Sequence, residues 1–266
     1  MILPAIRIPP DQPRLWLEAV GDLRGVRAVE LPAALLETAA EPVPPLLRRL
    51  GLSVLHADGL LPSGFLAHFT AATPPVRERL VLDLRRALAA CGAAGVRNLT
   101  LDLELQEPAQ GSLQADAAPL VRQILATMME QGMTFCLPLR LPLSWPGSRE
   151  WQAAANLAAE VLHPACAYAL TLELGDLPAD FPFESHIREL GFHLQILRLA
   201  YTPALGETPT TAQVTEWHRI LQRQGFKGVV VFCPRLSSVD GIRDACLRLD
   251  ALIAEAGLAP ADAKTE

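Results

Sequence analysis

Two hydrophobic patterns alternate along this chain. Short runs of β-branched and aliphatic residues, typical of buried parallel strands, alternate with longer stretches rich in Ala, Leu, Arg and Glu in which apolar residues recur at helical spacing. The short runs predict eight strands, at Leu3–Ile8, Val26–Pro32, Leu52–His56, Val96–Leu105, Met133–Leu141, Tyr168–Leu174, Leu194–Tyr201 and Val229–Cys233. Successive strands start roughly 25 to 45 residues apart, which leaves room for a helix and two loops after each strand.

The longer stretches contain recognisable helix ends. Thr73 and the two prolines after it predict a helix that runs through Arg77 to Cys91, because threonine can cap a helix and proline is tolerated in its first turn. Ser148 and Thr210 begin two further predicted helices, and the last helix is expected over Val239 to Ala256. Four glycines lie where a helix gives way to a strand and predict left-handed helix ends, namely Gly132, Gly191, Gly225 and Gly228.

Eight strands that alternate with helices predict an α/β protein, built either on a closed parallel barrel or on an open doubly wound sheet. The strand count and the length of 266 residues favour a single eight-stranded (β/α)8 TIM barrel. We expect the barrel to occupy residues 1–258 and the polar segment 259–266 to be frayed. The glycine-rich motifs of nucleotide-phosphate loops do not occur in the sequence.

Composition and charge argue against several classes of protein. Hydrophobic residues make up 50% of the chain and charged residues 20%, which predicts a large core rather than general disorder. The 23 basic and 29 acidic residues give a net charge of −6, which argues against a nucleic-acid partner. No apolar run approaches the roughly 20 residues that span a bilayer, and no signal peptide is expected. The five cysteines form no Cys-x-x-Cys pair, so reduced thiols in a cytoplasmic protein are expected.

Polar residues gather at the carboxyl ends of the predicted strands, where TIM barrels carry their chemistry. Asp102 and Glu104 alternate with leucines, so their carboxylates should face the barrel axis. The same alternation turns Thr171, Glu173 and Arg198 inward. The charged residues at these strand ends are nearly balanced in sign, with Arg7, Arg140, Arg198 and Arg235 opposite Glu30, Asp58, Asp102, Glu104 and Glu173. Since buried charges must be compensated, an ion-paired mouth is predicted, either as a ligand site or as a self-satisfied network.

Five segments occur in an order that is similar to one barrel family. They are Gly25–Leu31 with Glu30, Leu52–Ala57 with His56, Gly95–Asp102, Leu172–Asp176 with Glu173, and Gly225–Cys233. Together they resemble the second, third, fourth, sixth and eighth strands of the xylose isomerase-like TIM barrels. That superfamily includes sugar phosphate isomerases and epimerases and the apurinic-site endonucleases. The resemblance extends from Val26 to Leu252 and implies the same fold.

The resemblance also implies a degenerate metal site. Enzymes of this superfamily hold one divalent metal with Glu, Asp, His and Glu from the fifth to eighth strands, and the two glutamates carry out acid–base chemistry. Those positions fall on Pro138, Glu173, Arg198 and Cys233. Proline offers no side-chain ligand and arginine keeps its proton, so only Glu173 retains a plausible oxygen ligand. We therefore expect a divergent member that uses no cofactor.

The leading hypothesis is a sugar phosphate isomerase/epimerase-like barrel that binds a small polar or anionic, sugar-like ligand at its carboxyl-end mouth. Its candidate catalytic residues are His56, Glu173 and Asp102. Arg198 would replace the charge of the metal and pair with Glu173 and Asp102. The candidate ligand-binding residues are Arg198, Arg140, Arg235, Glu30, Asp176 and Trp145. The guanidinium groups of Arg140 and Arg235 suit a phosphate or a carboxylate.

Two alternatives remain open. A metal-dependent isomerase or epimerase could hold one divalent metal such as Mn or Zn with displaced ligands, namely Asp102, Glu104, Glu173 and Asp176. A non-catalytic barrel could instead act as a protein-interaction scaffold, with a protein partner or a homo-oligomer as its functional form. The fold alone does not separate these alternatives.

Overall fold

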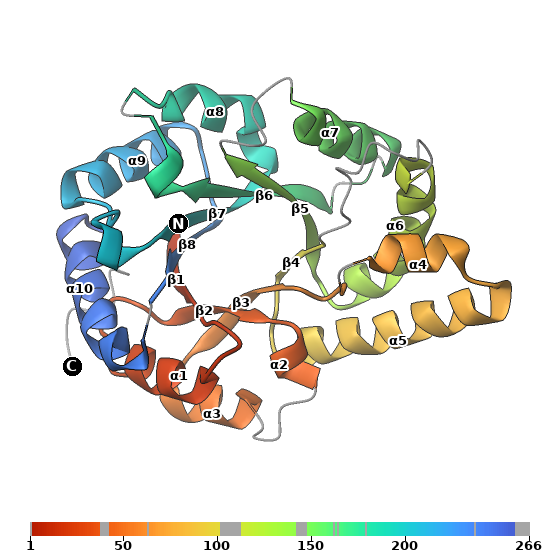
Figure 1. Ribbon diagram of the computed structural model, residues 1–266, viewed down its shortest axis with the longest axis horizontal. Coiled ribbons are helices and arrows are strands. Elements are labelled where there is room, and N and C mark those ends of the chain that lie inside the picture. Colours follow the sequence, from red (N-terminus) through yellow and green to blue (C-terminus); the bar gives the residue numbers. More distant parts are fainter. Residues whose placement is uncertain are drawn as a thin grey trace.

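Eight parallel strands close into a barrel in the order β1 to β8, with β8 hydrogen-bonded to β1. This computed structural model describes residues 2–37, 43–62, 64–101, 113–141, 148–161, 163, 165–178, 180–236 and 238–258. Helices form an outer ring around the strands (Figure 1). The predicted eight-stranded TIM barrel is therefore confirmed.

The strand bounds lie close to those predicted. The strands are β1 (Leu3–Arg7), β2 (Ala28–Pro32), β3 (Ser53–Asp58), β4 (Asn98–Thr100), β5 (Thr134–Leu141), β6 (Cys166–Glu173), β7 (Leu194–Tyr201) and β8 (Val229–Pro234). The largest difference is at β4, which was expected to begin at Val96 and to continue to Leu105. Residues 102–112, which contain the end of that prediction, lie outside the described residues.

The helices include the four that were predicted from their starting residues. Their bounds are α1 (Pro13–Gly21), α2 (Ala34–Glu37), α3 (Val43–Leu50), α4 (Phe65–Ala71), α5 (Pro74–Ala93), α6 (Leu113–Glu130), α7 (Arg149–Val161), α8 (Phe183–Leu190), α9 (Thr211–Arg223) and α10 (Ile242–Glu255). Thr210 caps α9 by accepting a hydrogen bond from the Gln213 amide. Thr73 makes no such side-chain bond at α5, which begins with Pro74. No helix among the described residues is long and apolar enough to cross a membrane.

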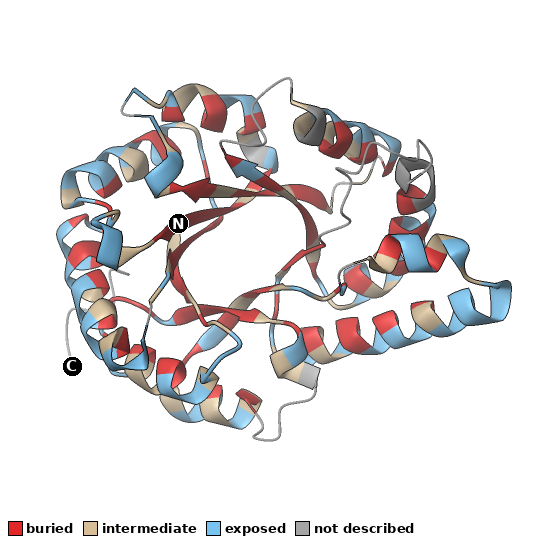
Figure 2. Ribbon diagram, viewed as in Figure 1, coloured by how far each residue is buried: buried red, intermediate tan, exposed pale blue. Residues whose placement is uncertain are grey.

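The strands separate two different hydrophobic regions. Large buried side chains such as Phe135 and Phe232 belong to the extensive core that includes the helices, and the strands are almost entirely buried (Figure 2). A second cluster, made mostly of small side chains, comprises Ala5, Ala28, Cys136, Ala167, Ala169, Ile196, Ala200, Val229, Val231 and Cys233. TIM barrels usually fill their interior with bulky branched residues. The small residues here leave space for large polar side chains inside the barrel.

The junction glycines are of two kinds. Gly132, Gly191 and Gly225 have positive φ angles of 66°, 54° and 71°, as expected for glycines that end helices. Gly228 does not, so the left-handed conformation predicted for it is wrong. A Cβ atom at Gly228 would lie 2.0 Å from the carbonyl oxygen of Gln195, so glycine is needed there because β7 and β8 approach closely.

We expect Gly228→Ala to lower the free energy of unfolding by about 2 kcal/mol, because the added methyl group forces the start of β8 away from β7. Gly241→Ala is the matched control, since a Cβ there meets nothing within 4 Å and φ is −83°. Urea denaturation of both variants measures the difference. Equal stability of the two variants would show that the strand junction adjusts without cost.

Candidate functional site

A buried polar network occupies the centre of the barrel. Glu30 on β2, His56 on β3, Thr100 on β4 and Arg198 on β7 are all buried, with exposed fractions of 0%, 0%, 4% and 5%. The Nε atom of Arg198 donates to both carboxylate oxygens of Glu30, at 3.1 and 2.8 Å. Its Nη2 atom donates to Thr100 Oγ1 at 2.9 Å and lies 3.1 Å from His56 Nε2. Side chains from four strands are thus joined through one guanidinium group.

A strand irregularity places His56 in this network. Val29 pairs with Val54, but the register shifts before the next residue, so Glu30 pairs with His56 rather than with Leu55. His56 Nδ1 lies 2.5 Å from Glu30 Oε2, and His56 Nε2 lies 2.7 Å from Thr100 Oγ1. The carboxylate of Glu30 favours the tautomer with hydrogen on Nδ1, which leaves Nε2 to accept the Thr100 hydroxyl hydrogen. Both ring nitrogens of His56 are therefore engaged by the protein.

Arg7 extends the network toward solvent. Its Nη1 atom lies 2.6 Å from Glu30 Oε1 and 2.5 Å from Asp58 Oδ2. The Arg7 side chain is 33% exposed, whereas that of Glu30 is fully buried. Two arginines therefore face two carboxylates in this cluster, which is neutral overall while His56 is uncharged. Asp58 Oδ1 is buried and has no hydrogen-bond partner among the described residues.

The pKa shifts follow from burial and from these charges. Burial alone would raise the pKa of Glu30, but the positive charge of Arg198 and the hydrogen bond from His56 hold that pKa well below its usual range. For His56, burial lowers the pKa and the Arg198 charge adds to this effect, although Glu30 opposes it. The network at neutral pH therefore combines an ionised Glu30, a neutral His56 and a charged Arg198.

A second charged cluster lies at the end of β6. Glu173 has a side chain that is 10% exposed, and Arg235 Nη2 donates to its Oε1 at 2.8 Å. Arg140 Nε lies 3.7 Å from the same oxygen. The side chains of Arg140 and Arg235 are 62% and 59% exposed. The predicted pair of guanidinium groups is therefore accessible to a solute, beside a carboxylate that is nearly buried.

The predicted pairing of Arg198 with Glu173 is wrong. In the register of β6 and β7, Arg198 lies opposite Thr171, whereas Glu173 lies two residues further along, opposite Ala200. Arg198 therefore lies deeper in the barrel than Glu173 and reaches Glu30 across the interior, as the hydrogen bonds show. Its predicted inward orientation is observed.

The remaining predicted site residues are either exposed or outside the described residues. Asp176 is exposed in the short 3-10 turn η1 (Leu174–Asp176). Asp102, Glu104 and Trp145 lie outside the described residues. Sequence reasoning missed Thr100, although a signal was present, since Thr100 stands two positions before Asp102 in the predicted strand and alternation predicts an inward side chain for it as well.

The thiol at the end of β8 is shielded from solvent. Cys233 is buried, and burial raises the pKa of its thiol far above the usual range. Its Sγ atom contacts the Val231 carbonyl oxygen at 3.8 Å. Within the described part of the chain, no group of three or more His, Cys, Asp or Glu side chains could hold a metal ion.

Comparison with known proteins identifies the fold. No family model matches the chain, and no curated protein matches it in sequence. Among solved structures, D-psicose 3-epimerase with D-tagatose from Clostridium cellulolyticum H10 has a TM-score of 0.65 and 15% identity, over 94% of this chain and 98% of that chain. This chain shares the barrel fold of that epimerase. An L-ribulose 3-epimerase has a TM-score of 0.66 and 17% identity, over 99% of this chain and 96% of that chain.

The chain is also similar in fold to a protein that is not named as an epimerase. An AP endonuclease of family 2 from Brucella melitensis has a TM-score of 0.64 and 19% identity, over 91% of this chain and 97% of its own. The fold that the sequence resemblance implied is therefore confirmed. At such low identities the similarity shows the fold alone, so function has to be argued from the side chains of the site.

We expect Arg198→Ala to lower the free energy of unfolding by about 3 kcal/mol or more, because it leaves the Glu30 carboxylate buried without its main partner. Arg219→Ala is the control, since it removes an exposed ion pair with Glu216 and should leave stability unchanged. Urea denaturation measures both. Adding Glu30→Gln to Arg198→Ala should recover part of the loss. Wild-type stability of Arg198→Ala would show that the guanidinium does not hold the network together.

Acid should destabilise the protein in two stages. The lowered pKa of His56 keeps it neutral in the folded protein, whereas the unfolded chain binds a proton below about pH 6.5, so stability falls there. The depressed pKa of Glu30 adds a further loss below about pH 4.3. His56→Gln should reduce the slope of unfolding free energy between pH 7 and 5 by up to about 1.4 kcal/mol per pH unit.

That slope should not vanish in His56→Gln, because burial also lowers the pKa of His186 and His218. The exposed His68 provides the control variant His68→Gln. Urea denaturation at a series of pH values gives the slopes independently of any overall loss of stability. An unchanged slope in His56→Gln would contradict the assignment of a neutral histidine.

Proposed function

We propose that this chain is a sugar isomerase/epimerase-like barrel that binds a small polar or anionic, sugar-like ligand at its carboxyl-end mouth without a divalent metal. One observation carries the proposal. The guanidinium of Arg198, 5% exposed, occupies the interior at the seventh-strand position to which the resemblance assigns a metal-binding histidine. In this proposal, the fixed positive charge of the guanidinium stabilises the surrounding carboxylates, as the charge of a metal ion would.

The side chains at the four corresponding positions do not suit a dication. Pro138 has no donor atom, and the charge of Arg198 would repel the ion. The thiol of Cys233 is buried, and among the described residues no group of three or more His, Cys, Asp or Glu side chains could hold an ion with it. Glu173 already binds Arg235. These features support binding without a metal, and we derive no reaction step through one.

The groups that meet a ligand in this proposal lie at the rim rather than in the centre. Arg140 and Arg235 present guanidinium donors that match a phosphate or carboxylate. Glu173 lies between them and can accept hydrogen bonds from sugar hydroxyl groups. The partly exposed Arg7 supplies a further donor on another side of the mouth. A ligand that combines hydroxyl groups with one anionic group would satisfy all of these residues.

Proton transfer at this mouth would fall to Glu173 among the described residues. Its carboxylate is partly exposed and contacts Arg235, a cation at the rim that can release it to a ligand. His56 has no exposed surface and both its nitrogens are engaged, so in this proposal it positions Glu30 and Thr100. Asp102, also a candidate from the sequence, lies outside the described residues.

Metal content and thermal stability test the proposal together. Protein purified without chelator should contain no stoichiometric metal, and Mn²⁺, Zn²⁺ and Mg²⁺ should not raise its Tm. A panel of sugar phosphates and sugar acids should include ligands that raise the Tm, since a ligand at a hundred times its Kd adds about 2.7 kcal/mol of stability. Stoichiometric metal, or stabilisation by one of the three ions, would overturn the proposal in favour of a metal enzyme with displaced ligands.

Arginine variants locate the bound ligand. Arg235→Met and Arg140→Met should each reduce the stabilisation by an anionic ligand, equivalent to about a tenfold weaker Kd, because a charge-assisted hydrogen bond is lost. The exposed Arg79 on α5 gives the control variant Arg79→Met, which should keep the full effect. If no sugar derivative stabilises the protein and it forms a stable oligomer instead, the scaffold alternative replaces the proposal.

A further inference from the structure

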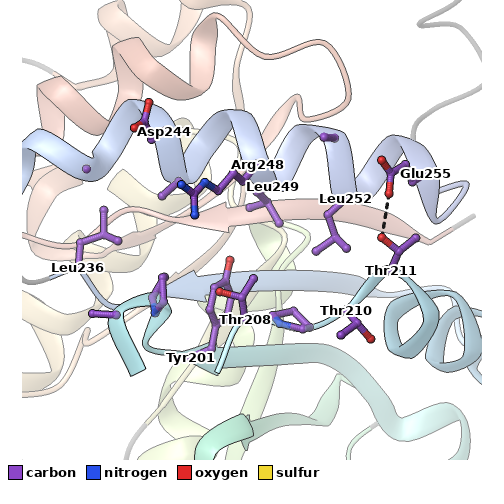
Figure 3. A pocket seen from close by; sticks show the side chains of 16 residues that line it. Tyr201, Thr208, Thr210, Thr211, Leu236, Asp244, Arg248, Leu249, Leu252 and Glu255 are labelled. Carbon is purple, nitrogen blue, oxygen red and sulfur yellow. Dashed lines mark hydrogen bonds between the residues drawn. The ribbon is translucent and has the colours of Figure 1, made fainter. Parts of the chain in front are cut away.

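A cavity lies beside α10, next to the carboxyl ends of β7 and β8. It has a volume of about 780 Å³ and is formed by the end of β7, the segment between β7 and α9, the segment after β8, and one side of α10 (Figure 3). Ligand pockets in proteins commonly measure about 300 to 1,000 Å³. None of the residues assigned above to the mouth lines this cavity.

The cavity has a continuous apolar side. Leu249 and Leu252 of α10 point into it, and Tyr201 and Leu236 line it from the strand ends (Figure 3). Tyr201, Leu249 and Leu252 are almost completely buried, with exposed fractions of 3%, 2% and 8%. This side of the cavity is therefore fixed by core packing, and the apolar surface that a ligand would remove from water lies mainly on the partly exposed Pro203, Leu236 and Ala245.

One cation borders this apolar side. Arg248 lines the cavity and extends along it, and within the described part of the chain it has neither an ion pair nor a hydrogen bond (Figure 3). The two acidic lining residues do not neutralise it. Asp244 points its carboxylate away from the cavity, and Glu255 accepts a hydrogen bond from Thr211 Oγ1 at 2.8 Å (Figure 3). Arg248 is therefore the charged side chain next to Leu249, whereas the Glu255 carboxylate lies about two helical turns further along α10, beside Thr211 (Figure 3).

We propose that this cavity binds an amphiphilic monocarboxylate of medium chain length. Its carboxylate would pair with Arg248 and accept a hydrogen bond from Thr208, which also lines the cavity. Its apolar chain would lie over Leu249, Leu252 and the ring of Tyr201. The length of α10 from Arg248 to Glu255 is about 10 Å, which limits the chain to medium length.

The cavity is separate from the mouth, so this inference does not depend on the proposed function. The end of β8 forms the partition. Arg235 directs its side chain to Glu173 at the mouth, while the next residue, Leu236, lines the cavity. The Arg235 amide donates to the Tyr201 carbonyl oxygen at 2.8 Å, which ties the partition to β7.

Decanoate, used below its micelle concentration, is the probe. The chain contains two tyrosines, and Tyr201 lines the cavity whereas Tyr168 lies on β6. With ring-labelled tyrosine, decanoate should shift the NMR signal of Tyr201 and leave that of Tyr168 unchanged, the two signals being assigned with Tyr168→Phe. Decanol should bind about tenfold more weakly than decanoate, because it lacks the charge that pairs with Arg248.

Two pairs of variants on α10 complete the test. Arg248→Met should weaken decanoate binding about tenfold, and Arg243→Met, which alters an arginine outside the lining, should not. Ala251→Trp should block the cavity, whereas Ala254→Trp, at an exposed residue outside the lining, should leave binding intact. Thermal denaturation confirms that each variant is folded. Equal binding to wild type, Arg248→Met and Ala251→Trp overturns the site, and equal binding of decanol and decanoate overturns the assignment of an anion.

Discussion

The ion pair between Arg198 and Glu30 is the interaction on which the interior of this barrel depends. Both groups are withdrawn from water, which is costly unless each charge is compensated and each donor finds an acceptor. The compensation comes from His56, Thr100 and Arg7, which join the pair through short hydrogen bonds or a short ion pair. The polar side chains fit inside the barrel because alanine and cysteine side chains line it where other TIM barrels carry bulky residues. Charge and volume inside the barrel are therefore matched to each other.

This arrangement divides the barrel into a buried polar centre and a charged rim that is accessible to solvent. The centre is neutral as a whole and its polar groups are largely occupied by one another, so it has little capacity left for a ligand. The rim differs, because Arg140 and Arg235 keep most of their surface in solvent while Glu173 is nearly buried between them. A polar ligand would exchange hydrogen bonds with these three side chains without opening the central network. The cavity beside α10 offers a second and chemically different surface, separated from the rim by the end of β8.

The fold and the inward orientation of the polar residues were accessible from the sequence because both depend on local periodicity. Alternating residues on a strand face opposite sides of the sheet, which was sufficient to direct Arg198 and Glu173 toward the barrel axis. The partners of these residues were not accessible in the same way. The prediction joined Arg198 to Glu173, but parallel register places the two residues at different depths, and Arg198 pairs with Glu30 instead. Gly228 shows the same limit, since its requirement for glycine arises from the neighbouring strand and not from its own helix end.

The sequence by itself determined the (β/α)8 class, the positions of the strands, and a mouth in which arginines and carboxylates nearly balance. The resemblance also led to the expectation that an arginine occupies a metal-ligand position of the superfamily. Only the tertiary structure decided that Glu30, His56, Thr100 and Arg198 meet, because that depends on the register shift between β2 and β3 at Val29 and Glu30 and on contacts across the closed barrel. Strand periodicity is a property of neighbouring residues in the chain. The depth, register and partner of a charged side chain are set by strands that lie far apart in sequence, and no local pattern encodes them.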